Sequence, residues 1–315
     1  MTSPALAARP TASAGRRRRS PGRSAVEGWF RGHVALVYLF LYLPILIVVL
    51  LSFNATNRNL TDWQGFSLKW YQKALDSDQV QKALWNSATI ALVNAILASA
   101  FGTMAALGLQ RVTSRIRVLF DALTYVSVII PEIVIALATL VLFRLVQDTA
   151  NPTLLQLTGG GFKIGLGQWS IIAAHVLFNT SLVLLLVRAR LSGMDRTHVE
   201  ASYDLYATPW RTFRQITFPQ LLPAIVAGFL LAFTFSFDDY VITQFVSGPG
   251  SQTLPLFIFG QTRQGVTPLT NAVASMMLLL TLTVLLLGQL ILSRNARRTG
   301  GGQAGGMAGM IAEQR

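Results

Sequence analysis

Three carboxylates lie deep within apolar segments of the sequence: Glu132, Asp238 and Asp239. A carboxylate at the centre of a membrane costs about 2.5 to 3.5 kcal/mol on insertion scales, so a function is the default hypothesis for it. Aromatic residues surround the two aspartates, and Tyr240 follows them directly. Carboxylates beside aromatic rings suit an amine cation, through ion pairing and cation–π contact, and suit an anion poorly. We therefore predict a translocation path lined by Glu132, Asp238, Asp239 and Tyr240.

The depth of these acids supports a common level in the membrane. Glu132 and Asp238 each lie fourteen residues from the inner start of a predicted span, about 21 Å at 1.5 Å per residue. Successive helical residues point about 100° apart, so Asp238 and Asp239 are expected to face different ways. Two structural alternatives remain open. The aspartates could form polar contacts between helices, and Glu132 could satisfy backbone groups freed by Pro131.

Other chemistry finds little support in the sequence. It contains no cysteine, and its histidines, His33, His175 and His198, are isolated from one another. No metal-ligand spacing results from them. A glycine-rich run precedes Lys163, but Ile164 follows where a phosphate-binding loop needs Ser or Thr. We therefore expect no catalytic residue, no metal and no cofactor in this chain, and predict that it is not an enzyme.

The composition is that of a membrane protein. Of the 315 residues, 52% are hydrophobic and 12% charged, whereas a soluble domain has about 25% charged residues. Six apolar segments are long enough to span a bilayer, which predicts an all-α polytopic fold. The predicted spans are residues 34–53, 88–109, 118 to about 145 (interrupted at Pro131), 169–187, 224–246 and 269–292.

The distribution of charge predicts the topology. Of the 26 Lys and Arg residues, 19 fall in segments assigned to the inside when both termini are cytoplasmic. The net charge of +13 therefore reflects orientation in the membrane better than binding to nucleic acid. Residues 1–33 are predicted to be a disordered basic cytoplasmic tail, and residues 293–315 a disordered Gly-rich one. The six-span domain would then cover residues 34–292, in the cytoplasmic membrane.

A polar segment at about residues 188–222 separates the fourth and fifth predicted spans. Thr197 and Glu200 fit a capping box, in which the Thr197 hydroxyl bonds the Glu200 amide. Thr208 followed by Pro209 predicts a second helix start. We expect two short helices that lie flat beside the membrane on its inner face and are accessible to a soluble partner.

The same segment resembles the cytoplasmic EAA loop of ABC importer permeases. The matching residues are Glu200, Ala201, Ser202, Asp204, Leu205, Ala207 and Pro209. Ser202 stands where the family usually has a second alanine, and Tyr206 where it usually has glycine. The resemblance implies a type I ABC importer permease (MetI-like) fold in which these residues, Tyr206 included, form a coupling loop. It also implies a separate ATPase dimer that binds ATP and Mg²⁺.

The C-terminal half resembles one branch of that family more closely. Its motifs are Ser236-Phe237-Asp238-Asp239 and Ser247-Gly248-Pro249-Gly250, and Pro131-Glu132 agrees with them. They resemble the second permease of importers for the polyamines putrescine and spermidine. The resemblance implies a heterodimer with another permease and a periplasmic or extracellular substrate-binding protein.

Two other readings stay open at this point. Relatives in the same branch handle ferric iron, thiosulfate or aminophosphonates, so the solute could be one of these. An ion-coupled secondary transporter would also place acids in the membrane, but it needs no long inner loop with capped helices.

Overall fold

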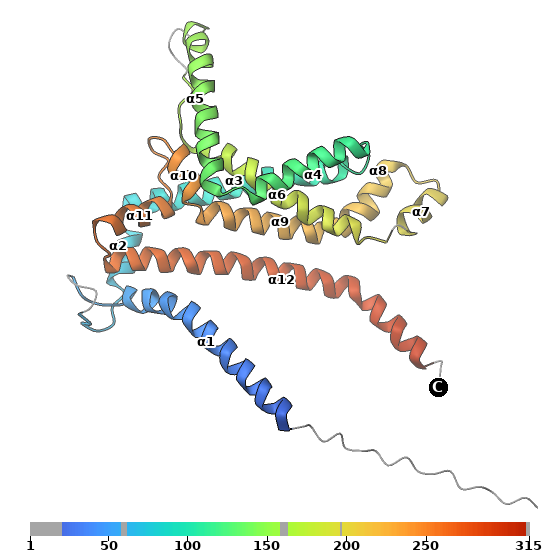
Figure 1. The fold of residues 1–315 in the computed structure, drawn as a ribbon, viewed down its shortest axis with the longest axis horizontal. Coiled ribbons are helices and arrows are strands. Elements are labelled where there is room, and N and C mark those ends of the chain that lie inside the picture. The colour runs from blue at the N-terminus through green and yellow to red at the C-terminus, as the bar shows by residue number, and fades with distance from the viewer. Residues whose placement is uncertain (1–20, 58–61, 158–162, 196, 313–315) are drawn as a thin grey trace, which may run out of the picture. The chain divides into compact units, whose positions relative to one another are not determined.

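The computed structural model describes residues 21–57, 62–157, 163–195 and 197–312. These residues form helices and no strand, apart from an isolated bridge between Asn54 and Phe66. The chain divides into two compact units, one ending at Leu50 and the other beginning at Leu51. The helices labelled in Figure 1 are α1 (Pro21–Ser52), α2 (Lys69–Leu75), α3 (Asp78–Gly108), α4 (Ser114–Ile129), α5 (Glu132–Leu157), α6 (Gln168–Ser192), α7 (Thr197–Asp204), α8 (Pro209–Thr212), α9 (Phe218–Asp238), α10 (Val241–Val246), α11 (Leu254–Gln264) and α12 (Pro268–Ala312). A short π-helix, η1 (Phe213–Thr217), joins α8 to α9.

Six stretches of the described helices are long and apolar enough to cross a membrane, which confirms the predicted number of spans. They are Gly28–Ser52, Asp78–Gly108, Glu132–Leu157, Gln168–Ser192, Pro209–Asp238 and Pro268–Leu290. The all-α polytopic fold class is therefore confirmed as well. The predicted interruption of the third span at Pro131 is confirmed. The predicted bounds of the third and fifth spans are wrong, because the stretches long enough to cross begin at Glu132 and end at Asp238.

The third predicted span is two helices. α4 ends at Ile129, Ile130 is extended with ψ 134°, and α5 begins at Glu132. Pro131 causes this break, because its ring disfavours the helical conformation of the preceding residue and it has no N–H to donate. The stretch long enough to cross a membrane is α5 alone, and it extends to Leu157, beyond the predicted end near residue 145.

The fifth predicted span is also interrupted. α9 ends at Asp238, and Asp239 is extended, with φ −67° and ψ 129°. The chain then forms the separate short helix α10 up to Val246. No proline lies at this break, so its cause is sought below in the side chain of Asp239.

Helices also occupy part of the two predicted tails. α1 begins at Pro21, inside the segment 1–33, and α12 continues to Ala312, inside the segment 293–315. Proline is favourable at a first helical position, and each residue added to an existing helix gains one hydrogen bond. For residues 21–33 and 293–312 the structure thus has helix in place of the predicted disorder. The rest of both tails lies outside the described residues.

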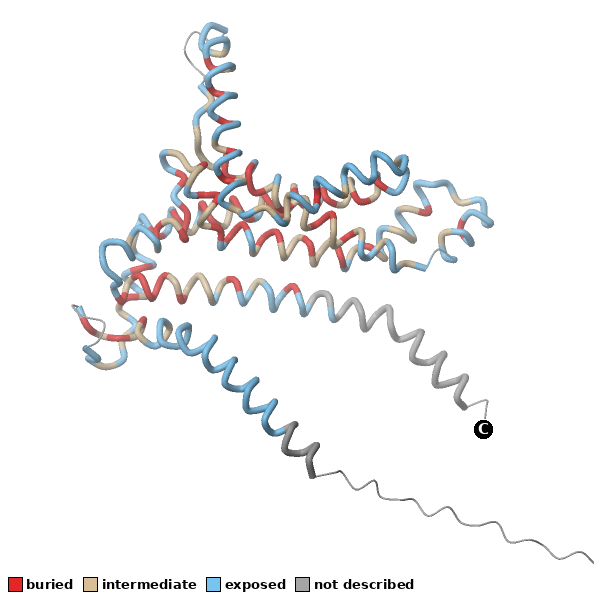
Figure 2. The backbone as a smooth tube through the Cα atoms, in the orientation of Figure 1, coloured by how far each residue is buried: buried red, intermediate tan, exposed pale blue. Residues whose placement is uncertain are grey.

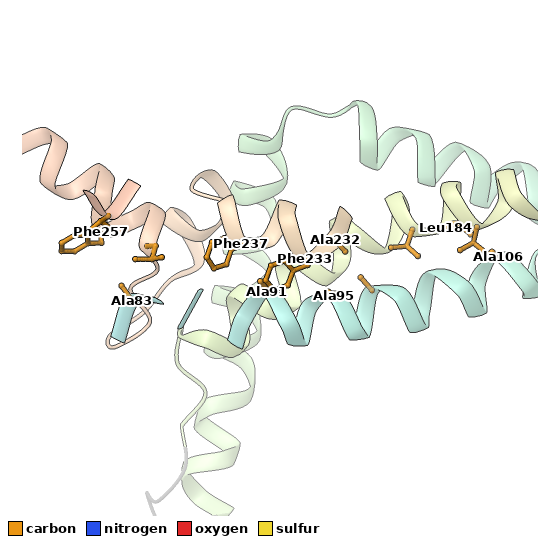
Figure 3. Packing of buried hydrophobic residues seen from close by; sticks show 14 of the residues in the cluster. Ala83, Ala91, Ala95, Ala106, Leu184, Ala232, Phe233, Phe237 and Phe257 are labelled. Atoms are coloured by element: carbon orange, nitrogen blue, oxygen red, sulfur yellow. The ribbon is translucent and has the colours of Figure 1, made fainter. Parts of the chain in front are cut away.

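The core of the second unit is the packing of α3, α6 and α9. These helices approach closely because small residues face a larger one: Val183 of α6 lies between Gly102 of α3 and Gly228 of α9. A Cβ atom at Gly102 would lie 2.8 Å from the Val183 Cβ atom, so only glycine fits there. Figure 3 shows Phe233 and Phe237 of α9 in the same cluster, and Figure 2 shows buried residues along these three helices.

α5 extends away from this three-helix core (Figure 1). At its start it packs on α10, where Ala136 and Phe143 join a second buried cluster with Ile242 and Val246. Much of the remaining surface of α5 is exposed (Figure 2). The two interrupted spans therefore meet each other, α5 of one against α10 of the other.

Candidate functional site

The two predicted short helices of the coupling loop are present as α7 and α8, and hydroxyl groups connect them. Ser202 is buried, and its hydroxyl donates to the Val199 carbonyl at 2.7 Å. It can then accept from the buried Thr212 hydroxyl, whose Oγ1 atom lies 2.9 Å from Ser202 Oγ. The serine at the usual alanine position therefore joins α7 to α8.

The caps of the two helices follow the prediction in one case only. Thr208 caps α8 as expected, since its side chain accepts from the Arg211 N–H at 3.4 Å and Pro209 follows it. The predicted capping box at α7 is wrong. Thr197 lies inside the helix and donates its N–H and its hydroxyl to Asp195 Oδ1, at 2.9 and 2.6 Å. The hydroxyl bond and the N–H bond from Thr197 both stabilise the ionised carboxylate, so they lower the pKa of Asp195.

Tyr206 has the backbone conformation for which the family usually has glycine. Its φ of 58° is the only positive value at a non-glycine residue in the described chain. The turn is kept, and the Tyr206 N–H donates to the Tyr203 carbonyl at 2.9 Å. An L-residue in this region carries strain of about 1 to 2 kcal/mol. The side chain is 96% exposed, so no packing within the described chain offsets that strain.

Most residues of the predicted coupling loop are accessible to a partner. Those exposed are Glu200, Ala201, Asp204, Leu205, Tyr206 and Pro209, whereas Ala207 is half-buried and Ser202 buried. Two hollows of about 670 and 590 Å³ adjoin the loop. Tyr203 and Trp210 line the larger, and Leu205 and Arg211 line the smaller. The loop is thus an exposed projection with apolar side chains on both sides.

Asp239 is buried and fully engaged in hydrogen bonds. Its Oδ2 atom accepts from the N–H of Thr243 at 2.8 Å and from the Thr243 hydroxyl at 2.7 Å, and its Oδ1 atom accepts from the Ile242 N–H at 3.3 Å. These are orphan donors at the start of α10, so the Asp239 side chain caps the helix from the position before its N-cap residue, Tyr240. This capping explains why the helix breaks here without a proline.

His175 of α6 completes the environment of Asp239. Its Nε2 atom lies 3.0 Å from Asp239 Oδ2, and its Nδ1 atom lies 2.7 Å from the Ser236 hydroxyl. Both His175 and Asp239 are buried. In the sequence this histidine is far from the other two. The signal that could have found it is its position inside an apolar span, where an ionisable group needs a polar partner.

Asp238 and Tyr240 point to other neighbours. Asp238 is exposed, and the Thr281 hydroxyl of α12 donates to it at 3.4 Å. The Tyr240 ring lies 4.2 Å from the Phe259 ring of α11, between centroids. The structure therefore separates the two aspartates, as expected from helical geometry, and it does not bring all four predicted path residues together.

Glu132 is half-buried in the first turn of α5, which packs on α10 where the two interrupted spans touch. That Glu132 and Asp238 lie at one level of the membrane stays a prediction. Within the described residues no group of three or more His, Cys, Asp or Glu side chains could hold a metal ion.

A second ion pair that sequence reasoning missed joins α4 to α6. Arg188 and Asp121 form a two-pronged contact, in which Arg188 Nη2 donates to Asp121 Oδ2 at 3.2 Å and Nη1 donates to Oδ1. Both side chains are about a quarter exposed. The pair holds the first half of the interrupted third segment to the core, so that α5 alone departs from it.

Comparison with known families identifies the chain. Residues 98–300 match the model of the "binding-protein-dependent transport system inner membrane component". The chain belongs to this family. It is accordingly a multi-pass permease of the inner membrane, in a family whose members transport solutes.

Individual relatives share much of the permease's length. It is 34% identical over 270 residues to a spermidine/putrescine permease, PotC, of Shigella flexneri, covering 86% of this chain and 96% of the relative. It is 38% identical over 260 residues to the PotC protein of Haemophilus influenzae, covering 82% and 95%. A putrescine permease, PotI, of Escherichia coli K12 is 38% identical over 262 residues, covering 82% and 86%.

Solved structures agree on the fold. A chain of a bacterial ABC transporter that imports alginate aligns with a TM-score of 0.69 at 15% identity, covering 87% of this permease and 96% of that chain. A chain of the MetNI methionine ABC transporter aligns with a TM-score of 0.56 at 16% identity, covering 70% and 99%. The permease therefore has the type I ABC importer fold.

Proposed function

We propose that this permease is a subunit of an ATP-driven importer for polyamines, with putrescine and spermidine as substrates. The observation that carries the proposal is its similarity, over more than four fifths of its length, to permeases named for these two substrates. The membrane-embedded acids support it, because a polyamine carries several ammonium groups that need carboxylates on the way across.

The proposed complex contains a second permease, two copies of an ATPase that bind ATP and Mg²⁺, and an external substrate-binding protein. The exposed coupling loop would seat in the ATPase. ATP closes the ATPase dimer, the loop moves inward, and the spans open the passage toward the binding protein. Hydrolysis then restores the inward-facing state. ATP is hydrolysed by the partner, and both termini of this chain lie in the cytoplasm.

Uptake by the reconstituted complex tests the substrate. Proteoliposomes containing the two permeases, the ATPase and the binding protein should accumulate labelled putrescine only with internal ATP. Unlabelled spermidine should compete, and an aminophosphonate should not. The proposed substrates would be wrong if neither polyamine were taken up, or if the aminophosphonate alone inhibited uptake. Uptake without ATP that collapses with an ion gradient would instead favour a secondary transporter.

Labelling tests the orientation, and the absence of cysteine makes the background clean. Single cysteines at Tyr206 in the coupling loop and at Gln64 serve as a matched pair. Gln64 lies between the first two predicted spans, which is the outer side when the N-terminus is cytoplasmic. In intact spheroplasts a membrane-impermeant maleimide should label Gln64→Cys and leave Tyr206→Cys unreacted until the membrane is permeabilised. The reverse pattern would contradict the proposed topology.

A further inference from the structure

Residues 247–253, here called the strap, join α10 to α11 and are bound to the starts of α3 and α6. The central contact is Asn86 of α3, which is 7% exposed. Its amide nitrogen donates to the carbonyls of Gly250 and Gln252, both at 2.9 Å, and its amide oxygen accepts from Gln168 of α6 at 2.5 Å. A primary amide can hold all three groups because it offers two donors and an acceptor in one plane.

Further contacts fix the strap along its length. At its α10 end, the Ser170 hydroxyl of α6 lies 2.7 Å from the Val246 carbonyl oxygen, within hydrogen-bond reach. At its α11 end, the N–H of the first α11 residue donates to the Ser87 hydroxyl of α3 at 2.9 Å. Between these points Gly248 lies so close to the chain before α6 that a Cβ atom would be 1.9 Å from the Leu166 carbonyl oxygen. The strap is thus attached to both α3 and α6.

The position of α10 depends on these contacts, because the preceding helix does not continue into it. α9 ends at Asp238 and the backbone of Asp239 is extended, so no unbroken series of helical hydrogen bonds joins α9 to α10. α10 in turn holds α5, which packs mainly on it (Figure 1). Ala136 of α5 is completely buried in the cluster that contains Ile242 and Val246 of α10. A movement of α3 and α6 therefore reaches α5 mainly through the strap and α10.

We propose that the strap is a mechanical link, held by Asn86 as a positioning residue, which keeps α10 and α5 attached to the three-helix core while the permease changes conformation. The strap binds the start of α6, and the coupling loop follows the end of the same helix. A movement received at the coupling loop thus reaches the core first and α5 afterwards. This inference rests on the proposed importer function and adds how the movement reaches α5.

The first test makes the link covalent. The exposed side chains of Gln79 in α3 and Gln252 in the strap meet, with 3.2 Å between Nε2 and Oε1. In Gln79→Cys/Gln252→Cys, a short bifunctional thiosulfonate should join the two positions and leave ATP-driven putrescine uptake by the reconstituted complex unchanged, since the strap stays closed throughout the cycle. The complex with wild-type permease, treated alike, is the control. Uptake that stops on crosslinking and returns with reductant would overturn the proposal, because the strap would then have to open.

Releasing the strap should have the opposite result. Asn86→Ala should lower the putrescine taken up per ATP hydrolysed by about threefold or more, within the range by which single residues modulate coupling between distant sites. The matched control is Gln81→Ala, which removes an exposed amide of α3 that bonds the Leu75 carbonyl and not the strap. Crosslinking Gln79→Cys to Gln252→Cys in the Asn86→Ala background should restore the ratio. A wild-type ratio in Asn86→Ala, or no rescue by the crosslink, would contradict the role of Asn86.

A second variant covers failure of Asn86→Ala to assemble. Gly248→Ala leaves Asn86 intact but places a Cβ atom against the Leu166 carbonyl, so the strap must move away from α6. The ratio of uptake to ATP hydrolysis should fall in the same way. A wild-type ratio in this variant would show that the fit of the strap against α6 does not matter for coupling.

A distance measurement tests the link without transport. Spin labels on Lys82→Cys of α3 and Asp148→Cys of α5 occupy exposed positions, and the chain has no other cysteine. In complexes with cysteine-free partner subunits, the distribution of distances between the labels should be clearly broader when Asn86→Ala is added. Equal widths would overturn the link even if wild type transports putrescine. Wild type that takes up no putrescine would instead refute the proposed function, and a broader distribution would still support the link.

Discussion

The coupling loop and the acidic junction, where α5, α6, α9 and α10 meet around His175 and Asp239, are built in opposite ways. The loop is one continuous segment, mostly exposed, and held by contacts between near neighbours such as Asp195–Thr197 and Thr208–Arg211. The junction is assembled from four helices, is largely buried, and depends on the His175–Asp239 contact between residues 64 apart in sequence. Side chains of the loop are therefore available to another protein, whereas those of the junction support the fold itself. Changes in the loop should alter function more than stability, and changes in the junction should alter both.

The largest expected effect is the loss of uptake in Glu200→Ala. The side chain is exposed on α7, so its removal should leave the melting temperature of the purified permease unchanged. ATP hydrolysis by the complex should become independent of substrate, while putrescine uptake is abolished. Asp76→Ala, which removes an exposed acid beyond the end of α2, should transport normally. Normal uptake in Glu200→Ala would contradict the proposed role of the loop in coupling. It would also contradict the expected difference between the two regions.

Next in size is the loss of stability in His175→Leu. Removing one partner of a buried ion pair or charge-assisted bond costs about 3 to 5 kcal/mol, because the other group stays buried without compensation. Thermal unfolding in detergent should show a clearly lowered melting temperature. The double variant His175→Leu/Asp239→Asn should recover part of it, since the buried carboxylate is gone. A melting temperature equal to wild type in His175→Leu would show that the junction does not support the fold.

The same contrast explains how far the sequence could be interpreted. Glu200 to Pro209 is contiguous, and Thr208-Pro209 is a helix start that depends on neighbouring residues alone, so both were predictable. The six spans follow from length and apolar composition. The break after Asp238 does not, because it depends on the side chain of Asp239 capping α10. The contacts His175–Asp239 and Arg188–Asp121 join distant residues whose meeting depends on how the helices pack.

Within the loop itself, Ser202 tests whether its few buried contacts matter. Ser202→Ala matches the usual family residue, yet it should destabilise this permease by about 1 kcal/mol, because the buried Thr212 hydroxyl loses its partner. Adding Thr212→Val should restore the wild-type melting temperature, since replacing both partners by apolar groups of similar shape is nearly neutral. A single variant as stable as wild type would show that the hydroxyl pair does not connect α7 to α8.

The smallest expected change in stability is at Tyr206. Its variants separate the effect of backbone strain from the effect of the exposed ring. Glycine relieves strain of about 1 to 2 kcal/mol at a φ of 58°. It also loses more conformational entropy on folding, which costs about 0.5 to 1 kcal/mol of stability. Tyr206→Gly should therefore stabilise the permease by about 1 kcal/mol or less in thermal unfolding. Tyr206→Asn, which tolerates the left-handed region, is the control that removes the ring while keeping a side chain.

Uptake then tells what the ring does. A strained residue that is 96% exposed gains nothing from its own chain, so the strain is offset only if the ring is buried against another protein. Both variants should then be at least as stable as wild type and yet take up putrescine more slowly, with weaker binding of the ATPase in a pull-down titration. Full uptake and unchanged ATPase binding in both would show that Tyr206 is simply tolerated at the glycine position, and that the exposed residues of the loop are not all used by its partner.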